Sequence, residues 1–551
     1  MKVVIIGGVA GGATAAARLR RESESAEIVI LERGAYVSFA NCGLPYFIGR
    51  EITHREKLLL QTPEGFWDRY RIKVQTNAEV KNIDTKKKIL NLVINGKTES
   101  MSYDKLLLSQ GALPIKLPIP GAELPHVFSL RDMKDMDLIE SFIEKNKPKS
   151  VLVAGAGFIG LELVEAFKHR GLTNVHLVEI GKTPMPMLDP EFGIEIEQEL
   201  QVHGVVFHSG LGLQKIETEK CTLSNGKEIS AQFVILAAGV RPELVLAKEA
   251  GISFGEQGGL AVNSFLQTSD PDIYGVGDMV EIHHRVLDKN VRVPLAGPAN
   301  RQGRIAAMNI LKGNKVEYKG ALGSSVVKVF SKAAASTGLT ENQVKRAGIP
   351  YKAIAIHGRD HAGYYPGATS LHLKLLFHSQ NKKILGAEAF GTKGVEKRID
   401  VIATALLGGL TIDDLSEVDL CYAPPFSSAN DPVNMACFVA QNSISGFSPT
   451  VTAEEMFGEL QKDPSVLILD VRKEEEFKSG HVDGAKLIPV DDLRIKLSEL
   501  PRDKKILVHC QVGFRGHLAV RILQENGFKN VFNVTGGYRS IQLWQQYMNR
   551  I

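Results

Sequence analysis

Near its start the chain reads Lys2-Val3-Val4-Ile5-Ile6-Gly7-Gly8-Val9-Ala10-Gly11-Gly12. The β-branched run to Ile6 predicts a strand, the glycines predict a tight turn, and the alanine-rich residues from about Ala13 to Arg21 predict a helix. A further predicted strand, Ile28 to Leu31, ends at Glu32. Glycines let a pyrophosphate approach the backbone, a helix N-terminus offers N–H donors, and the acid accepts from ribose hydroxyls. The stretch therefore predicts a dinucleotide-binding α/β unit, with cofactor contacts at Gly7, Gly8, Gly11, Gly12 and Glu32.

The same pattern recurs about 150 residues later. A predicted strand, Ser150 to Ala154, leads into Gly155-Ala156-Gly157-Phe158-Ile159-Gly160, and a later strand, Val175 to Val178, ends at Glu179. This copy has all three glycines of G-x-G-x-x-G, whereas the first copy has Val9 at the middle position. Two copies predict two dinucleotides. Glu179 favours NADH, because a carboxylate repels a 2′-phosphate, and NADPH stays possible because Lys182 lies nearby.

Composition excludes several classes of protein. The chain has 551 residues, enough for several domains, with 44% hydrophobic and 23% charged residues. Its net charge of +4 gives no support to binding of nucleic acid or a membrane surface, and no run of about twenty apolar residues predicts a membrane span. The five cysteines form no CxxC pair and no metal spacing, so we expect no metal site and a reducing, cytoplasmic location. The glycines after Ile6 favour a nucleotide loop over a signal peptide.

A third segment, Thr268 to Asp278, resembles the strand-ending motif of FAD-dependent pyridine nucleotide reductases. The segments Leu107–Ala112 and Ile235–Pro242 resemble the two crossover strands of the same family. The resemblance implies that FAD occupies the first loop and NADH the second. It also implies that the aspartate accepts hydrogen bonds from the ribityl chain, and it adds cofactor residues Ala112, Gly239, Gly277 and Asp278.

The sequence Ser38-Phe39-Ala40-Asn41-Cys42 resembles the single-cysteine branch of that family: coenzyme A-disulfide reductases, NADH oxidases and NADH peroxidases. The position of the second cysteine in two-cysteine relatives holds Phe47. In the coenzyme A enzymes the lone cysteine forms a mixed disulfide with the coenzyme, and in the oxidases and peroxidases it becomes a sulfenic acid. We expect a lowered pKa for the Cys42 thiol, which would make it a good nucleophile and leaving group.

Several further residues favour coenzyme A. Arg18 and Arg21 lie three apart on a predicted helix, so they share a face that could clamp phosphates. The family resemblance implies a coenzyme A pocket at Thr14, Arg18, Arg21, Ser38, Asn41 and Asn300. It also implies a homodimer in which Tyr364, or alternatively Tyr365, and Tyr422 reach the partner subunit's active site.

The last hundred residues resemble a rhodanese domain. A polar stretch from Gln441 to Pro449 predicts a linker, and a strand from Leu467 to Asp470 begins the signature. A later strand, Ile506 to His509, delivers Cys510 into a loop ahead of a helix from about Gly516. Such a loop aims N–H groups at the thiol and could hold a persulfide. Its members are Cys510, Gln511, Val512, Gly513, Phe514 and Arg515.

The resemblance implies the α/β fold class, with two Rossmann-like domains for FAD and NAD(P)H, an α+β dimerisation domain and a rhodanese-like α/β domain. The expected ranges are 1–115 with 246–321 for FAD, 116–245 for NAD(H), 322–445 for dimerisation, 446–452 for the linker and 453–551 for rhodanese. The implied activity is FAD-dependent, NADH-driven reduction of coenzyme A persulfide, polysulfide or disulfide, with sulfane sulfur donors as partners. An NADH oxidase or peroxidase and a flavoprotein redox sensor are the alternatives.

Overall fold

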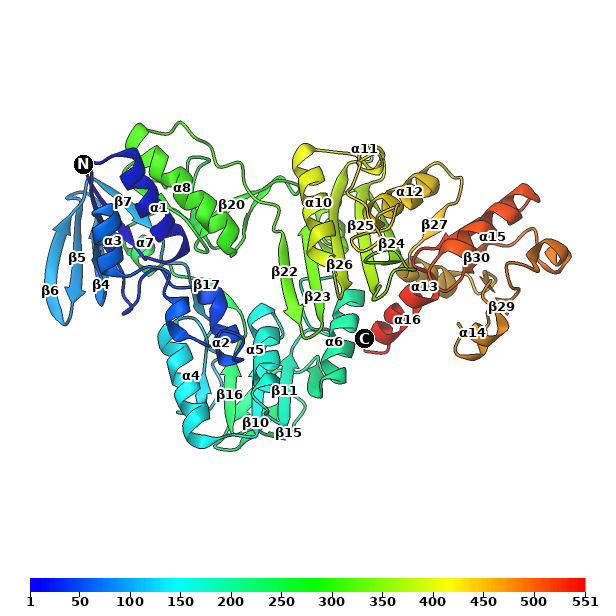
Figure 1. Ribbon diagram of the computed structural model, residues 1–551, viewed down its shortest axis with the longest axis horizontal. Helices are drawn as coiled ribbons and strands as arrows, with labels where there is room; N and C mark the ends of the chain where they lie inside the picture. Colours follow the sequence, from blue (N-terminus) through cyan, green and yellow to red (C-terminus); the bar gives the residue numbers. More distant parts are fainter. Residues whose placement is uncertain (551) are drawn as a thin grey trace. The chain divides into compact units, whose positions relative to one another are not determined.

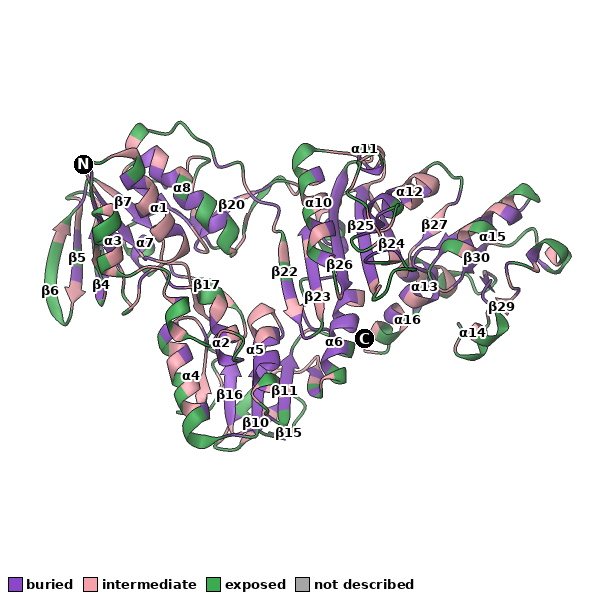
Figure 2. Ribbon diagram, viewed as in Figure 1, coloured by how far each residue is buried: buried purple, intermediate pink, exposed green. Residues whose placement is uncertain are grey.

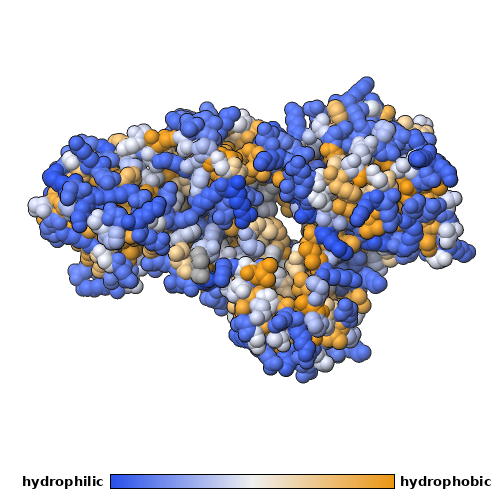
Figure 3. All heavy atoms as spheres, turned by 180° about the vertical axis from the view of Figure 1, so that it is seen from behind, coloured by the Kyte–Doolittle hydropathy of each residue, from blue (hydrophilic) through white to orange (hydrophobic). Residues whose placement is uncertain are grey.

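The computed structural model describes residues 1–550 and divides into two compact units. The first unit combines Met1–Ile180 with Gly204–Gly323, and the second combines Gly181–His203 with the chain from Ser324 onward (Figure 1). In both units the strands of the large sheets are mostly buried, whereas short edge strands, helix faces and loops carry most of the exposed residues (Figure 2). Hydrophilic residues cover most of the face shown in Figure 3, with hydrophobic residues in smaller patches between them.

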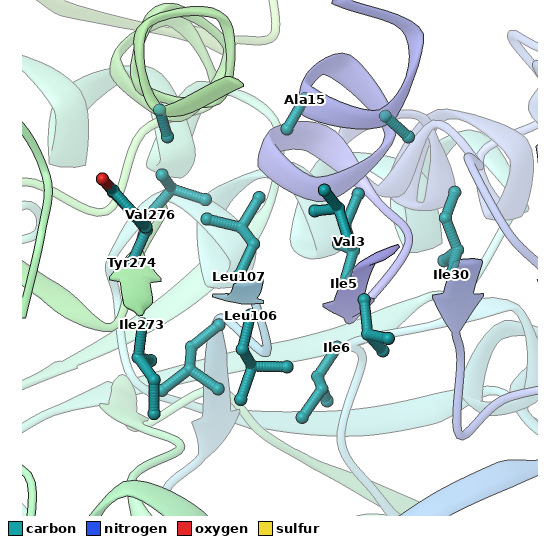
Figure 4. Packing of buried hydrophobic residues seen from close by; sticks show 14 of the residues in the cluster. Val3, Ile5, Ile6, Ala15, Ile30, Leu106, Leu107, Ile273, Tyr274 and Val276 are labelled. Atoms are coloured by element: carbon teal, nitrogen blue, oxygen red, sulfur yellow. The ribbon is translucent and has the colours of Figure 1, made fainter. Parts of the chain in front are cut away.

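The first sheet of the first unit is parallel, in the order β19-β7-β1-β2-β3. Its strands read as continuous apolar runs, as expected for a parallel sheet that is buried on both faces. Val3, Ile5 and Leu107 are fully buried, and Figure 4 shows them packed beside Ile30 and Tyr274 of the neighbouring strands. The strands are β1 (Lys2–Ile6), β2 (Glu27–Leu31), β3 (Lys73–Gln75), β7 (Lys105–Leu108) and β19 (Ile273–Gly275).

Two long helices lie side by side on this sheet, α1 (Ala10–Glu22) and α8 (Ala296–Lys312). Their backbones approach so closely that a Cβ on Gly303 would lie 2.2 Å from the carbonyl oxygen of Gly11. The shorter helices are α2 (Leu44–Ile48), α3 (Pro63–Tyr70) and α7 (Val245–Glu249). Two small sheets complete the domain. One is antiparallel and consists of β4 (Ala78–Asp84), β5 (Ile89–Ile94) and β6 (Lys97–Ser102). The other is mixed and consists of β18 (Leu260–Ala261), β20 (Val280–His284) and β21 (Lys289–Arg292), with β18 parallel and β21 antiparallel to β20.

A second parallel sheet repeats this plan in the order β12-β11-β10-β16-β9. The strands are β9 (Val127–Phe128), β10 (Ser150–Ala154), β11 (Asn174–Glu179), β12 (Val205–Ser209) and β16 (Phe233–Leu236), with helices α4 (Met133–Asn146) and α5 (Phe158–His169). A small antiparallel sheet follows: β13 (Leu213–Ile216), β14 (Lys220–Leu223) and β15 (Glu228–Ser230). The paired strands β8 (Ala112–Pro114) and β17 (Val240–Pro242) carry the chain between the two domains.

The second unit contains a five-stranded antiparallel sheet in the order β22-β23-β26-β25-β24. The strands are β22 (Ser325–Val329), β23 (Lys332–Gly338), β24 (Tyr351–Arg359), β25 (Ser370–His378) and β26 (Ile384–Gly391). The helices of this part are α6 (Pro190–Val202), α9 (Glu341–Ala347), α10 (Val395–Gly408), α11 (Ile412–Ser416) and α12 (Pro432–Ile444).

The C-terminal part of the second unit is a parallel sheet in the order β27-β31-β30-β28-β29. The strands are β27 (Thr450–Val451), β28 (Leu467–Asp470), β29 (Lys486–Leu487), β30 (Ile506–His509) and β31 (Val531–Val534), with helices α13 (Ala453–Lys462), α14 (Glu474–Lys478), α15 (Phe514–Glu525) and α16 (Gly537–Met548). The four expected architectures are therefore confirmed.

The expected linker is wrong in extent. Gln441–Ile444 belongs to the end of α12, and Thr450–Val451 pairs with β31, so the connection is only a few residues long. The buried face of α12 continues from Ala440 to Ser443, so the helix extends into a stretch whose polar composition had predicted a linker. Within residues 1–550, no helix has the length and apolar character that crossing a membrane would require.

Candidate functional site

The first glycine loop joins β1 to α1 at the carboxyl end of the sheet. Gly7 has φ of +96°, and a Cβ there would lie 2.3 Å from the carbonyl oxygen of Ser109. A Cβ on Gly12 would lie 1.9 Å from the carbonyl oxygen of Gly7, so only glycine lets the helix start this close to the turn. The carboxylate of Glu32 accepts the N–H of Gly8 at 2.9 Å, which places the predicted acid against the loop.

The second loop repeats this geometry almost atom for atom. Gly155 has φ of +109°, and its Cβ would lie 2.2 Å from the carbonyl oxygen of Ala237. A Cβ on Gly160 would lie 1.9 Å from the carbonyl oxygen of Gly155. Glu179 accepts the N–H of Ala156 at 2.8 Å, as Glu32 does in the first loop. Both loops thus have the form that the repeated sequence predicted.

Val9 is compatible with the first loop for a physical reason. The matching residue, Gly157, has φ of −81°, and a Cβ there would meet no atom within 4 Å. Val9 has φ of −100°, so neither position requires glycine. The departure from the sequence pattern therefore leaves the architecture of the loop unchanged.

The surroundings of the first loop fit a bound dinucleotide. A Cβ on Gly11 would lie only 2.9 Å from the side chain of Val276, so glycine keeps α1 close to the end of β19, and the buried Oε1 of Gln110 has no hydrogen-bond partner within the described residues. Gly277 follows β19 with φ of +84°, and its N–H donates to Gln302 at 2.7 Å. Burial raises the pKa of the adjacent Asp278, while Arg131 opposes the rise.

The remaining predicted cofactor residues lie on the crossover strands. Ala112 begins β8 and pairs with Pro242 of β17, and Gly239, with φ of +95°, directly precedes β17. Sequence reasoning missed Gln302 and Arg131. Gln302 lies in the interior of α8, far along the chain from either glycine motif, so no local pattern marked it.

Cys42 lies on a short 3-10 helix, Asn41–Gly43, just before α2, and it is accessible to solvent. Its Sγ is 3.8 Å from Oδ1 of Asn41, and Phe47 is buried at the position where two-cysteine relatives carry the second cysteine. The surrounding protein raises the pKa of the thiol, first by desolvation and then through the carboxylates of Glu162 and Asp278. The expected lowering of the Cys42 pKa by the protein is therefore wrong, because desolvation and, after it, two nearby carboxylates disfavour the thiolate.

Glu162 was not singled out from the sequence, although it stands two residues after Gly160. It lies in the first turns of α5 and accepts the hydroxyl of Tyr46, on α2, at 3.1 Å. Burial raises the pKa of Glu162 to about 7. The helix of the second loop therefore carries a carboxyl group that titrates near neutrality and acts electrostatically on Cys42.

The predicted coenzyme A residues gather along α1, α8 and the segment before Cys42. The hydroxyl of Thr14 donates to Oδ1 of Asn300 at 2.7 Å, so two of them are in contact. Arg18 pairs with Glu22 on its own helix, and its buried Nε has no partner. Arg21 is exposed.

Ser38 and Asn41 flank the thiol segment. Ser38 has φ of +48°, an unusual backbone conformation for serine, and Asn41 is exposed beside Cys42. Strained residues of this kind are often found at functional sites.

The predicted tyrosines lie in the second unit and are in contact. The hydroxyls of Tyr364 and Tyr422 are 3.0 Å apart, and the two residues are 76% and 47% exposed. Tyr365 instead turns its ring edge-on to His361. The geometry favours Tyr364 over Tyr365 as the partner of Tyr422 in a shared polar site.

The C-terminal cysteine loop joins β30 to α15. Cys510 is 1% exposed, and its sulfur accepts the N–H of Gly513 at 3.1 Å. Val512 and Phe514 are 39% and 65% exposed, so the loop presents apolar side chains outward. Gly513 has φ of +109°, which the curl of the loop requires. The loop thus directs the backbone N–H of Gly513 at the thiol, which agrees with the expected orientation of the loop.

The neighbouring Asp470 and Arg472 form a buried ion pair beside the loop. Their charged groups are 2.7 Å apart and both are buried, and the Arg472 guanidinium also donates to Gln511 at 3.2 Å. The arginine lies over the ring of Tyr538, 3.9 Å from its centre. Burial lowers the pKa of His509 to about 4, so this histidine is neutral at physiological pH.

Three family models match successive parts of the chain. Residues 1–303 match the family described as pyridine nucleotide-disulphide oxidoreductase, and residues 324–432 match its dimerisation domain. Residues 453–543 match the rhodanese-like domain.

Individual proteins resemble this chain over long stretches. A coenzyme A disulfide reductase of Staphylococcus aureus is 37% identical over 443 residues, which cover 80% of this chain and 100% of the relative. The structure of reduced Bacillus anthracis CoADR-RHD is 44% identical, covers 100% of this chain and 98% of its own, and superposes with a TM-score of 0.95. That of an NAD-dependent persulfide reductase from A. fulgidus is 36% identical, with coverage of 99% and 100% and a TM-score of 0.91.

Proposed function

The chain belongs to the pyridine nucleotide-disulphide oxidoreductases, and from this premise we propose that it uses FAD and NADH to reduce coenzyme A persulfide, polysulfide or disulfide. The observation that carries the proposal is a lone accessible thiol, Cys42, in a unit that contains two dinucleotide loops of matching geometry. A second cysteine loop, around Cys510, gives the same chain a place to carry sulfane sulfur.

The first loop would hold FAD. Its glycines leave the backbone open to a pyrophosphate, Glu32 lies against the loop, and Asp278 and Gly277 lie at the end of β19. When bound there, FAD supplies the relay of an electron pair between nicotinamide and sulfur.

The second loop would bind the nicotinamide dinucleotide. Glu179 is held against it by the N–H of Ala156, which places a carboxylate where a 2′-phosphate would be repelled. This arrangement favours NADH over NADPH, and the ratio of kcat/KM for the two cofactors measures the preference. All five cysteines are unpaired, which fits a reducing compartment such as the cytoplasm.

Cys42 performs the sulfur chemistry. Its thiolate attacks the coenzyme A-bound sulfur of a persulfide, the S–S bond breaks, and sulfide leaves as a Cys42–coenzyme A disulfide forms. With coenzyme A disulfide the leaving group is coenzyme A thiolate. Two electrons then release coenzyme A and restore the thiolate. The sum is CoA persulfide, NADH and one proton giving coenzyme A, hydrogen sulfide and NAD⁺, so atoms and electrons balance.

The tyrosine pair supports a homodimer. Tyr364 and Tyr422 are largely exposed although their hydroxyls are in contact, and they belong to the part that matches a dimerisation domain. A tyrosine hydroxyl can donate a proton to a departing thiolate or sulfide. We propose that the pair serves the Cys42 site of the partner subunit in this way.

Single substitutions of the two cysteines test the proposal. Cys42→Ser should abolish NADH consumption with every sulfur acceptor. Cys510→Ser should leave coenzyme A disulfide reduction unchanged but slow turnover with polysulfide about tenfold, because the local supply of sulfane sulfur near the reductase is lost. Both rates are measured from NADH absorbance under argon.

Three results would contradict the proposal. Full activity of Cys42→Ser with sulfane acceptors would remove the thiol from the reaction, and equal loss with both substrates in Cys510→Ser would contradict the division of labour. Oxygen or peroxide consumption faster than persulfide reduction would identify an oxidase or peroxidase instead.

A further inference from the structure

Arg515, the cationic residue of the Cys510 loop, forms an ion pair with Glu476. Arg515 is the last residue of the loop, and its two terminal nitrogens each donate to one oxygen of Glu476 at 2.6 Å. This bidentate contact is the strongest geometry available to an arginine and a carboxylate. Glu476 lies on the short helix α14, and its carboxylate also accepts the N–H of Lys473 at 3.0 Å, so it is fixed from two sides.

The electrostatics of the loop follow from this pair. The hydrogen bonds from Arg515 lower the pKa of Glu476 to about 2, so the carboxylate is charged throughout the physiological range. Cys510 also contributes, after the hydrogen bonds to Glu476, to the raised pKa of Arg515, so the ion pair lies within electrostatic reach of the loop cysteine. The other arginine of the site, Arg472, is buried and is neutralised by Asp470.

The outward side of the loop is apolar rather than cationic. Val512 and Phe514 are its exposed side chains, and the charges of Arg515 and Glu476 cancel beside them. An inorganic dianion arriving at Cys510 would meet a carboxylate beside each of the two guanidinium groups, Arg515 and Arg472. A donor with an apolar arm would instead bury part of that arm against the two hydrophobic side chains.

We propose that Glu476 sets the donor selectivity of the Cys510 loop: by neutralising Arg515 it favours organic persulfides with an apolar arm and disfavours anionic inorganic donors such as thiosulfate. Glu476 acts through Arg515 and is therefore a positioning residue. The inference rests on the proposed role of Cys510 as a sulfur carrier and names the class of donor that the carrier accepts.

The transfer step balances for both kinds of donor. With an organic persulfide, the Cys510 thiolate attacks the terminal sulfur, the S–S bond of the donor breaks, and the donor leaves as a thiol that takes the persulfide proton. Cys510 keeps the sulfur as a persulfide anion. With thiosulfate the same attack releases sulfite, and in neither case is an external oxidant or reductant needed.

The test compares two donors on the full-length holoenzyme: pantetheine persulfide, whose uncharged arm carries methyl and methylene groups and no phosphate, and thiosulfate. Glu476→Gln retains an oxygen that can accept the Lys473 N–H but removes the charge. We expect kcat/KM for thiosulfate to rise about tenfold, as removal of one charge near a bound anion predicts, and to remain within about threefold for pantetheine persulfide. The gain should shrink as salt is raised from 0.05 to 0.5 M, because screening weakens charge interactions.

Three controls separate charge at the loop from other effects. Glu475→Gln removes an exposed charge from the same helix and should leave both donors at wild-type rates. Glu476→Gln combined with Arg515→Gln should lose the thiosulfate gain, because the released cation is gone. Val512→Lys adds an unpaired cation without touching the ion pair, so it should also raise thiosulfate transfer, and it serves if Glu476→Gln does not fold.

The outcomes distinguish the two proposals. An unchanged thiosulfate rate in both Glu476→Gln and Val512→Lys, or an equal gain in Glu475→Gln, would overturn the selectivity inference. A wild-type enzyme that transfers sulfur from neither donor, while Cys42 still reduces coenzyme A disulfide, would instead refute the carrier role of Cys510.

Discussion

The thiol of Cys42 is surrounded by groups that oppose its ionisation. Desolvation and the carboxylates of Glu162 and Asp278 raise its pKa, and a backbone hydrogen bond opposes the rise. Glu162 is itself shifted to about 7 by burial, so its negative charge appears only as the pH passes neutrality. At low pH both groups are protonated, and as the pH rises the newly charged Glu162 makes the thiol harder to ionise.

This coupling predicts the effect of Glu162→Gln. Removing the carboxylate should lower the pKa of Cys42, so the pH profile of iodoacetamide alkylation of the NADH-reduced enzyme should move to lower pH. At pH 8 the alkylation rate should increase about threefold, the size expected for one partly screened charge interaction. Glu51→Gln is the control, since Glu51 raises the pKa of Tyr46 but is not among the influences on Cys42. A profile unchanged by Glu162→Gln would show that the carboxyl does not act on the thiol.

At the scale of elements, the same strand–turn–helix geometry occurs at two glycine loops, Gly7–Gly12 and Gly155–Gly160. The strand, the glycine turn and the helix approach one another at matching distances in both Rossmann-like domains. The close approaches lie at the first and last glycines of each loop, where a Cβ would overlap backbone oxygen, and not at the middle position. The feature that the two loops share is therefore the close contact between turn and helix, which directs backbone N–H groups toward a ligand.

The two glycines of the second loop should respond differently to alanine. Gly160→Ala places a Cβ 1.9 Å from the carbonyl oxygen of Gly155, so the loop and α5 must separate, at a cost of about 1–3 kcal/mol or more. We expect KM for NADH to rise at least tenfold while the flavin absorbance is retained, because we propose that FAD binds the other domain.

Gly157→Ala is the matched control for that substitution. A Cβ there meets no protein atom within 4 Å, so thermal unfolding should stay at the wild-type temperature. Equal destabilisation by the two substitutions would contradict the account of the loop.

At the scale of the whole molecule, the second unit is assembled from stretches of chain that are far apart in sequence. Lys374 of β25 is fully buried, and its ammonium lies 2.9 Å from Asp189, 2.6 Å from Glu191 and 2.6 Å from Glu341. It thereby joins the segment around α6 to the antiparallel sheet and to α9. Asp189, Glu191 and Glu341 are spaced as the ligands of a metal ion would be, but here the positive charge among them is the ammonium of Lys374.

The C-terminal module is attached to the same sheet. The hydroxyl of Thr535 donates to the carbonyl of Ala355 at 2.7 Å and accepts its N–H at 3.0 Å. Ser540 bonds His357 at 2.9 Å, and Arg539 donates to Ser370 at 2.7 Å. These contacts hold the cysteine-loop module against β24 and β25 across a short connection.

Removing the central cation should weaken this unit. Lys374→Met leaves several buried carboxylates without their partner, so we expect a loss of about 3–5 kcal/mol in the free energy of unfolding, measured in urea. The exposed pair between Lys382 and Asp413, 2.8 Å apart, offers a matched comparison. Lys382→Met should cost less than about 1 kcal/mol. Similar costs for the two variants would show that the buried cluster does not hold the segments together.

The local motifs were predictable because their physics is local. The glycine loops and the Cys510 loop each need particular residue types at fixed spacing in one short stretch, and each lies between a strand and a helix as predicted. Boundaries were less predictable: α1 begins at Ala10 rather than Ala13, and α15 begins at Phe514 rather than Gly516. Helix ends depend on capping and packing as much as on composition.

The amino-acid sequence by itself determined the repeated dinucleotide turns, the solitary redox thiol and the cysteine loop, since short-range backbone geometry and residue chemistry suffice for them. Only the tertiary structure decided that Glu162 acts on Cys42, that Tyr364 meets Tyr422, and that Glu476 neutralises Arg515. These pairs are separated by tens of residues or more, and their electrostatic energies depend on distance and burial. Both quantities arise only when the helices and strands pack together.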